Sequence, residues 1–75
     1  MQDQTLRYQN FILKPCSYQL AISKKWLPKL MLDDNKLSEV VETPLTWAKE
    51  FDTEEEANTY AIAQAKMFID KKSAG

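Results

Sequence analysis

Residues 49–72, KEFDTEEEANTYAIAQAKMFIDKK, contain the clearest structural signal in this chain. Thr53 precedes three glutamates, which is typical of a capping box, where the threonine hydroxyl accepts a hydrogen bond from a backbone N–H of the first helical turn. The three acids complement the positive end of a helix dipole, and Lys71 and Lys72 complement the negative end. The stretch therefore predicts one helix that begins after Thr53 and runs almost to the C-terminus.

The predicted helix is apolar over a wide part of its circumference. Its central stripe consists of Ala57, Ala61, Ala65 and Phe68. Ile62 and Ile69 lie on one flank of this stripe, and Tyr60 and Met67 lie on the other. A helix that lies on one sheet needs an apolar stripe of roughly 100°, and this one is about twice as wide. Either Tyr60 and Met67 form the rim of the monomer core, or they contact a second copy of the chain. We favour self-association, because chains of this size often need a partner to be stable.

Alternating apolar residues before the helix predict strands. RYQNFILK, residues 7–14, indicates a first strand that Pro15 ends, because proline has no N–H for a sheet ladder. SYQLAIS, residues 17–23, is either a short strand or a connection. WLPKLMLDDN, residues 26–35, indicates a strand that ends in a turn at DDNK, and Pro28 favours an edge or bulged position for it.

Two further strands are expected after that turn. A short one is possible around Val40 and Val41, and LTWAKEF, residues 45–51, predicts the last strand after a break at Pro44. The only glycine is Gly75, which disfavours two-residue hairpins of the Asn-Gly type. We therefore expect an α+β fold (β-β-β-α), an antiparallel three- or four-stranded sheet followed by one C-terminal helix packed on one face. Residues 1–75 form one small domain, with residues 1–5 and 73–75 disordered.

Composition limits the chemistry that the chain can perform. It has 75 residues, ten basic and eleven acidic, no histidine and one cysteine, Cys16. One cysteine cannot form an internal disulfide or a structural zinc site, and it favours a reducing compartment. Neither a secretory leader nor a membrane-spanning apolar run is evident. We expect a soluble cytoplasmic protein that has no metal, no cofactor and no membrane partner.

The sequence offers little for catalysis. Without histidine, Cys16 has no base to activate it, and serine-type or papain-like catalysis is excluded. The acid pairs Asp33 with Asp34 and Glu50 with Asp52 are conceivable acid–base groups, but neighbouring acids are far more often solvated turn formers. We therefore predict no catalytic residue and no enzyme.

Two classes of function remain. The first is a small interaction or regulatory module, most simply a homodimer or a partner of another protein, with Tyr60, Met67 and Trp47 as candidate contact residues. The second is a nucleic-acid-binding regulator, because basic residues around an aromatic ring suit a single-stranded ligand. Its candidate residues are Lys24, Lys25, Trp26 and Lys29. The acidic stretch at residues 39–56 would repel a polyanion, so we favour the first class.

The chain resembles a group of small bacterial proteins of unknown function. Their pattern is an aromatic-rich first strand, a later W-x-P strand, and F-x-T-x-E-E-A leading into a helix that ends A-K-x-x-I-D. The corresponding segments here are YQNFILKP, WLPKLML, FDTEEEA and AKMFID, within residues 8–70. The resemblance implies a sheet followed by a C-terminal helix and no catalytic residue; some members are labelled transcriptional regulators. This chain has Lys24 and Lys25 before Trp26, where the group has glycine.

Overall fold

The structure of the chain is a computed structural model that describes residues 5–35 and 40–74. In these ranges, six strands precede one helix. In chain order the elements are β1 (Leu6–Tyr8), β2 (Phe11–Pro15), β3 (Tyr18–Gln19), β4 (Trp26–Leu27), β5 (Lys29–Asn35), β6 (Val40–Thr46) and α1 (Glu54–Ala74).

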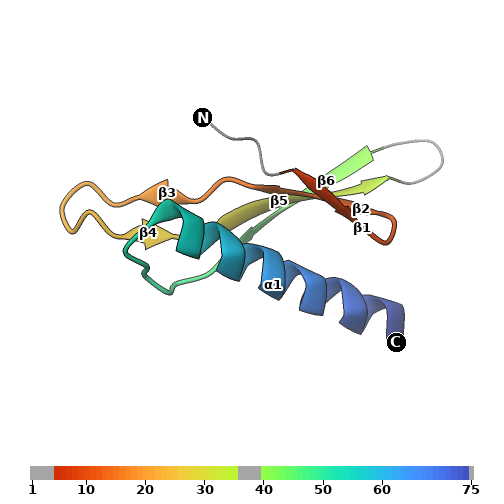
Figure 1. Cartoon of the computed structure of the whole chain (residues 1–75). Helices are drawn as coiled ribbons and strands as arrows, with labels where there is room; N and C mark the ends of the chain where they lie inside the picture. Colours follow the sequence, from red (N-terminus) through yellow and green to blue (C-terminus); the bar gives the residue numbers. More distant parts are fainter. Residues whose placement is uncertain (1–4, 36–39, 75) are drawn as a thin grey trace.

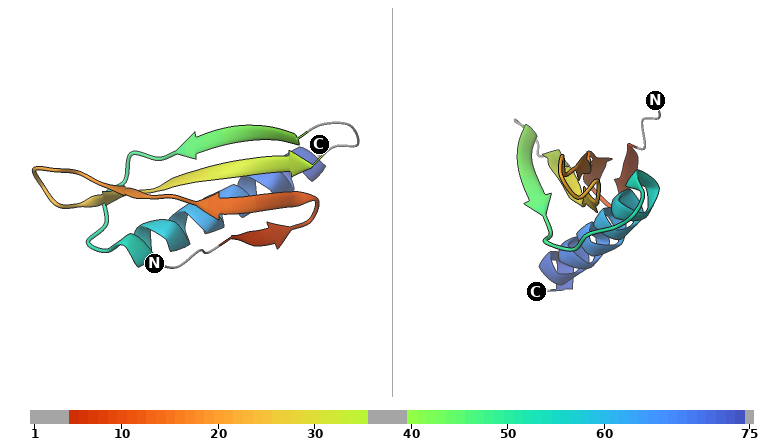
Figure 2. Two further views of the ribbon diagram at one scale, coloured as in Figure 1. Left: turned by 90° about the horizontal axis from the view of Figure 1, so that it is seen from above. Right: turned by 90° about the vertical axis from the view of Figure 1, so that its left-hand side faces the viewer.

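The strands form an antiparallel meander with a projecting hairpin (Figure 1). The main sheet has the order β1-β2-β5-β6, and β3 pairs with β4 in a separate two-stranded sheet between β2 and β5 in the sequence. The helix crosses one face of the main sheet obliquely, and no helix of the described ranges lies over the other face (Figure 2). The predicted α+β fold, with a four-stranded sheet and one C-terminal helix, is confirmed; the β3–β4 sheet is an addition.

The start of α1 has the threonine contact of the predicted capping box. The Glu56 N–H donates to Thr53 Oγ1 at 3.1 Å, and the Ala57 N–H donates to the Thr53 carbonyl at 3.2 Å. The helix runs to Ala74, so residues 73 and 74, which the sequence suggested were disordered, are helical. Residues 1–4 and 75 lie outside the described residues.

The core lies between α1 and the sheet. Its fully buried apolar side chains are Leu13, Leu30 and Leu32 from the sheet and Ala57, Ala61, Ala65 and Ile69 from the helix. The prediction that Phe68 ends the buried stripe is wrong, because Phe68 is 39% exposed and Ile69 is buried. Buried positions on the helix follow four-residue steps, each of which turns by about 40° around the axis. Because α1 crosses the sheet obliquely, its sheet-facing side turns in the same way, and Phe68 is left at the margin.

The predicted single strand at residues 7–14 is in fact a hairpin. β1 pairs with β2 with Tyr8 opposite Phe11, so only Gln9 and Asn10 form the turn. The sequence disfavoured such a turn because it contains no glycine there, yet Gln9 adopts a φ of 55°. Two hydrogen bonds hold this turn to the helix: Tyr8 Oη donates to Asp70 Oδ1 at 2.8 Å, and Gln9 Nε2 donates to the same oxygen at 3.1 Å. Tertiary contacts therefore offset a locally unfavourable backbone conformation.

Of the two alternatives that Pro28 suggested, an edge position or a bulged one, the edge position is wrong. β5 is a central strand, and the buried Pro28 lies at the break between β4 and β5. Polar contacts stabilise the chain where the two sheets meet. The Ser17 N–H donates to Asn58 Oδ1 at 3.3 Å, and the Lys29 N–H donates to Ser17 Oγ at 3.4 Å. A missing donor at Pro28 thus interrupts the ladder without moving the strand to the edge.

The ends of the later strands also differ from the prediction. β5 continues to Asn35, so the acids expected to form a turn belong to the strand. β6 passes through Pro44 and ends at Thr46, and Phe51 forms only an isolated bridge with Trp26. Pro44 is tolerated because β6 is an edge strand. The Trp47 N–H donates inward to the Pro28 carbonyl at 3.3 Å, so by alternation the Pro44 nitrogen points to the open edge.

Replacing Ile69 by alanine tests whether the packing of α1 on the sheet stabilises the fold. Because Ile69 is fully buried, Ile69→Ala should lower the free energy of unfolding by about 2–5 kcal/mol. Ile22→Ala is the matched control: its side chain is 97% exposed, so the change should stay within about 0.5 kcal/mol. Urea denaturation followed by circular dichroism measures both, and equal losses would contradict this packing.

Candidate functional site

An apolar groove separates the edge strand β6 from the second half of α1. It has a volume of about 250 Å³ and is lined by Leu45, Thr46, Trp47, Gln64, Met67, Phe68 and Lys71. The groove exists because α1 packs mainly on β5 and β2, which leaves β6 away from the helix (Figure 2). We call this feature the β6–α1 groove. Two of its lining residues, Leu45 and Trp47, also pack against the buried core, so the groove lies at the margin of the core.

An aromatic cluster supports one end of this groove. The ring of Trp47 meets the ring of Tyr60 edge to face, with 6.2 Å between centroids, and Phe51 lies 5.2 Å from Tyr60. Lys49 Nζ lies 5.5 Å from the centroid of the Tyr60 ring. Such edge-to-face and cation–π contacts favour fixed ring positions. Trp47 is therefore held in place at the groove rather than free on the surface.

The structure brings two of the three predicted contact residues together. Trp47 and Met67 both line the β6–α1 groove, whereas the half-buried Tyr60 contacts Trp47 from outside the lining. Met67 is 60% exposed. Sequence reasoning missed Phe68, because its helical position assigned it to the buried stripe. The groove thus joins a tryptophan, a methionine and a phenylalanine, side chains that are enriched at protein interfaces.

One charged residue lines the groove. Lys71 is the only ionisable lining residue, and in the described part of the chain it forms no ion pair. Its neighbour Lys72 instead has its ammonium 5.7 Å from the centroid of the Phe68 ring and 5.9 Å from that of Phe11. An occupant of this groove would therefore need an apolar part for Met67 and Phe68 and a negative group for Lys71.

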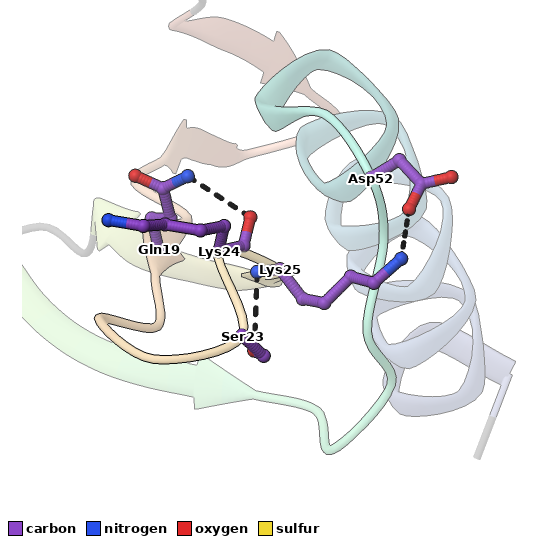
Figure 3. Close-up of polar contacts among 5 residues, drawn as sticks. All are labelled: Gln19, Ser23, Lys24, Lys25 and Asp52. Carbon is purple, nitrogen blue, oxygen red and sulfur yellow. Dashed lines mark hydrogen bonds and ion pairs between the residues drawn. The ribbon is translucent and has the colours of Figure 1, made fainter.

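The four residues predicted for nucleic-acid contact come from the β3–β4 hairpin and the start of β5, and the two neighbouring lysines diverge. Lys24 and Lys25 extend in opposite directions from the loop that joins β3 to β4 (Figure 3). Lys25 forms an ion pair with Asp52, which raises the pKa of its ammonium. The backbone of Trp26 pairs with Phe51, with N–H···O distances of 2.8 and 2.9 Å. Lys29, in β5, lies across the Pro28 break from the other three.

The helix-free face of the sheet carries an ion cluster. Asp33 is only 6% exposed, and Lys14 Nζ lies 2.7 Å from its Oδ2 and 3.2 Å from Glu42 Oε2. The hydrogen bond to Asp33, followed by that to Glu42, holds the pKa of the Lys14 ammonium above its ordinary value. Asp33 Oδ1 is buried and has no hydrogen-bond partner among the residues that the structure describes. Lys14 is thus the group that compensates the buried carboxylate.

The acid pairs that the sequence offered for catalysis are not arranged as pairs. Asp33 and Asp34 are consecutive in β5, so their side chains point to opposite faces of the sheet. Asp52 is bound to Lys25. Among the residues that the structure describes, no group of three or more His, Cys, Asp or Glu side chains could hold a metal ion.

No family model, no curated protein and no solved structure matches the chain. The helix α1 is too polar to cross a bilayer, and it is the one helix in the described ranges.

Removing the Lys14 ammonium should destabilise the fold, because it leaves the Asp33 carboxylate buried without a cation. We expect Lys14→Met to lower the urea midpoint at pH 7 more than Lys29→Met does, and Asp33→Asn to restore part of the loss. The pKa of Lys14 is raised in the folded state, so this stabilisation is complete below the ordinary value of 10.5. It is lost as the pH rises through the folded-state value. As the pH rises from 7, the gap between wild type and Lys14→Met should therefore stay constant at first and shrink once the solution is strongly alkaline.

Proposed function

We propose that this chain is a non-enzymatic interaction module that works as a homodimer and makes the contact with the outer side of α1 and the β6–α1 groove. The observation that carries the proposal is the exposure of Met67 and Phe68 beside that groove, next to the fixed ring of Trp47. Exposed apolar side chains that gather around a hollow favour a binding surface over a purely solvated one.

A second copy suits this surface better than a ligand strand on β6. Pro44 lies in the middle of β6 with its nitrogen facing outward, so a strand added there loses a central hydrogen bond. The helix side of the groove has no such obstacle. The buried core is also small, and three of its seven apolar side chains are alanines. Covering Met67 and Phe68 in a dimer adds apolar burial that a chain of this size lacks.

The absence of a catalytic role is part of the proposal. The chain contains no histidine. Asp33 and Asp52 each form an ion pair with a lysine. Each of them belongs to one of the two acid pairs that the sequence offered as acid–base groups. These contacts support binding as the activity, because general acid–base catalysis needs a group poised to exchange a proton with a substrate.

A nucleic-acid-binding regulator is the second candidate, and the geometry favours it less. Lys24 and Lys25 diverge, and Lys25 is already paired with Asp52. A stacking surface needs its cations and its ring on one side of the molecule. Salt-dependent binding of a single-stranded oligonucleotide, weakened by Lys24→Ala and Lys29→Ala, would instead favour this candidate.

The dimer is tested by placing a charge in the contact surface. Met67→Glu puts a carboxylate where the second copy would bury an apolar side chain, which is costly. We expect sedimentation velocity to show a dimer for the wild type and a monomer for Met67→Glu. Ile22→Glu is the control, because Ile22 is also exposed but lies in the loop between β3 and β4 and does not line the groove.

Circular dichroism must show that both variants keep their helix, since a folding defect would also abolish association. A wild-type monomer at high micromolar concentration would contradict the proposal. A folded Met67→Glu variant that still sediments as a dimer would place the contact elsewhere.

A further inference from the structure

We infer that the two copies pair through antiparallel α1 helices in one register, which sets Glu56 of one copy opposite Lys71 of the other. This inference rests on the proposed homodimer and specifies how its surfaces meet. It uses a row of side chains along the outer side of the helix that we call the α1 ridge. The α1 ridge consists of Glu56, Tyr60, Ala63, Met67 and Lys71.

The α1 ridge lies opposite the side of the helix that packs on the sheet. Its residues follow steps of three and four, which keep them within a narrow sector of the helix. Glu56, Ala63, Met67 and Lys71 are exposed, and Tyr60 is half-buried. The buried residues Ala57, Ala61, Ala65 and Ile69 point the other way. The α1 ridge is therefore the part of the helix that a second copy can reach.

The order of side chains along the α1 ridge is self-complementary when it is reversed. It begins with an acid and ends with a base, and the apolar positions lie between them. Glu56 and Lys71 share a midpoint between Ala63 and Gln64, and Tyr60 and Met67 share the same midpoint. A two-fold axis through that point therefore sets Glu56 opposite Lys71, and Tyr60 opposite Met67, twice in one dimer.

A parallel arrangement does not offer this match. It would set Glu56 against Glu56 and Lys71 against Lys71, and like charges at these positions repel. In the antiparallel arrangement the two helix dipoles also point in opposite directions, which is the favourable alignment. Charge therefore selects the antiparallel orientation, and the positions of Tyr60 and Met67 select the register.

The centre of the proposed contact has the shape that close packing needs. Ala63 is exposed and has the smallest side chain of the α1 ridge, so two helices can approach closely at that point. Beside it, Gln64 and Lys71 line the β6–α1 groove together with Met67 and Phe68. The partner's Glu56, and the part of its Tyr60 ring that the aromatic cluster leaves exposed, would then face this groove.

Reversing the charges tests the register directly. Glu56→Lys and Lys71→Glu each replace two attractive contacts in the dimer by two repulsive ones, and each should weaken association about tenfold at low salt. The double variant Glu56→Lys/Lys71→Glu restores opposite charges and should recover most of the affinity. Glu55→Lys is the control, because it makes the same change in the first helical turn but points away from the α1 ridge.

Cysteine cross-linking provides a second, independent readout. In a Cys16→Ser background, Ala63→Cys places the two thiols beside the two-fold axis, so mild oxidation should yield a covalent dimer within minutes. Glu55→Cys in the same background should cross-link much more slowly, since its two thiols lie far from the axis.

The outcomes separate this inference from the proposed function. A wild-type chain that does not dimerise overturns both. A chain that dimerises, is weakened by Met67→Glu, and yet shows neither recovery in the double variant nor rapid Ala63→Cys cross-linking overturns the register alone. Equal weakening by Glu55→Lys and Glu56→Lys would likewise contradict it, because the loss would then reflect helix stability.

Discussion

The fold depends on the contact between the buried side of α1 and three leucines of the sheet. Ala61 and Ala65 are small, so the helix backbone approaches Leu13, Leu30 and Leu32 closely, and Ile69 ends the contact. This interface uses one side of the helix only, and it follows the oblique path of the helix across the sheet. The narrow row of alanines determines which side of α1 faces the sheet. The apolar residues on the other sides of the helix are therefore left exposed.

Polar contacts at both ends of the helix fix its rotation on the sheet. Near the N-terminal end, buried Asn58 accepts a hydrogen bond from the backbone of Ser17, where the two sheets meet. Near the C-terminal end, Asp70 accepts hydrogen bonds from Tyr8 and Gln9 in the β1–β2 hairpin. The bond to Asp70, with burial as a smaller cause, raises the pKa of the Tyr8 phenol. Because Asn58 and Asp70 lie near opposite ends of the helix, the helix cannot roll without breaking one of these contacts.

Local signals in the sequence were enough for the helix, its cap and the fold class, but not for the strand ends. The Thr53 cap acts within one turn, so its residues alone specify it. Pro44 and Pro28 behave according to where the strand lies in the sheet, which the sequence does not display. The turn at Gln9 depends on Asp70, a residue distant in sequence. For the groove, Trp47 and Met67 were predictable as surface candidates. Phe68 was not, because its exposure follows from the oblique path of the helix.

The two outer strands of the main sheet also have a consequence for solubility. β1 has only three residues, and β6 presents Pro44 to solvent at its centre. Open strand edges are templates for uncontrolled aggregation and fibril growth, and natural sheets protect them with short strands and prolines. Both ends of this meander have such a device. The short β1 and the outward-facing Pro44 therefore both oppose edge-to-edge pairing of this sheet with another copy.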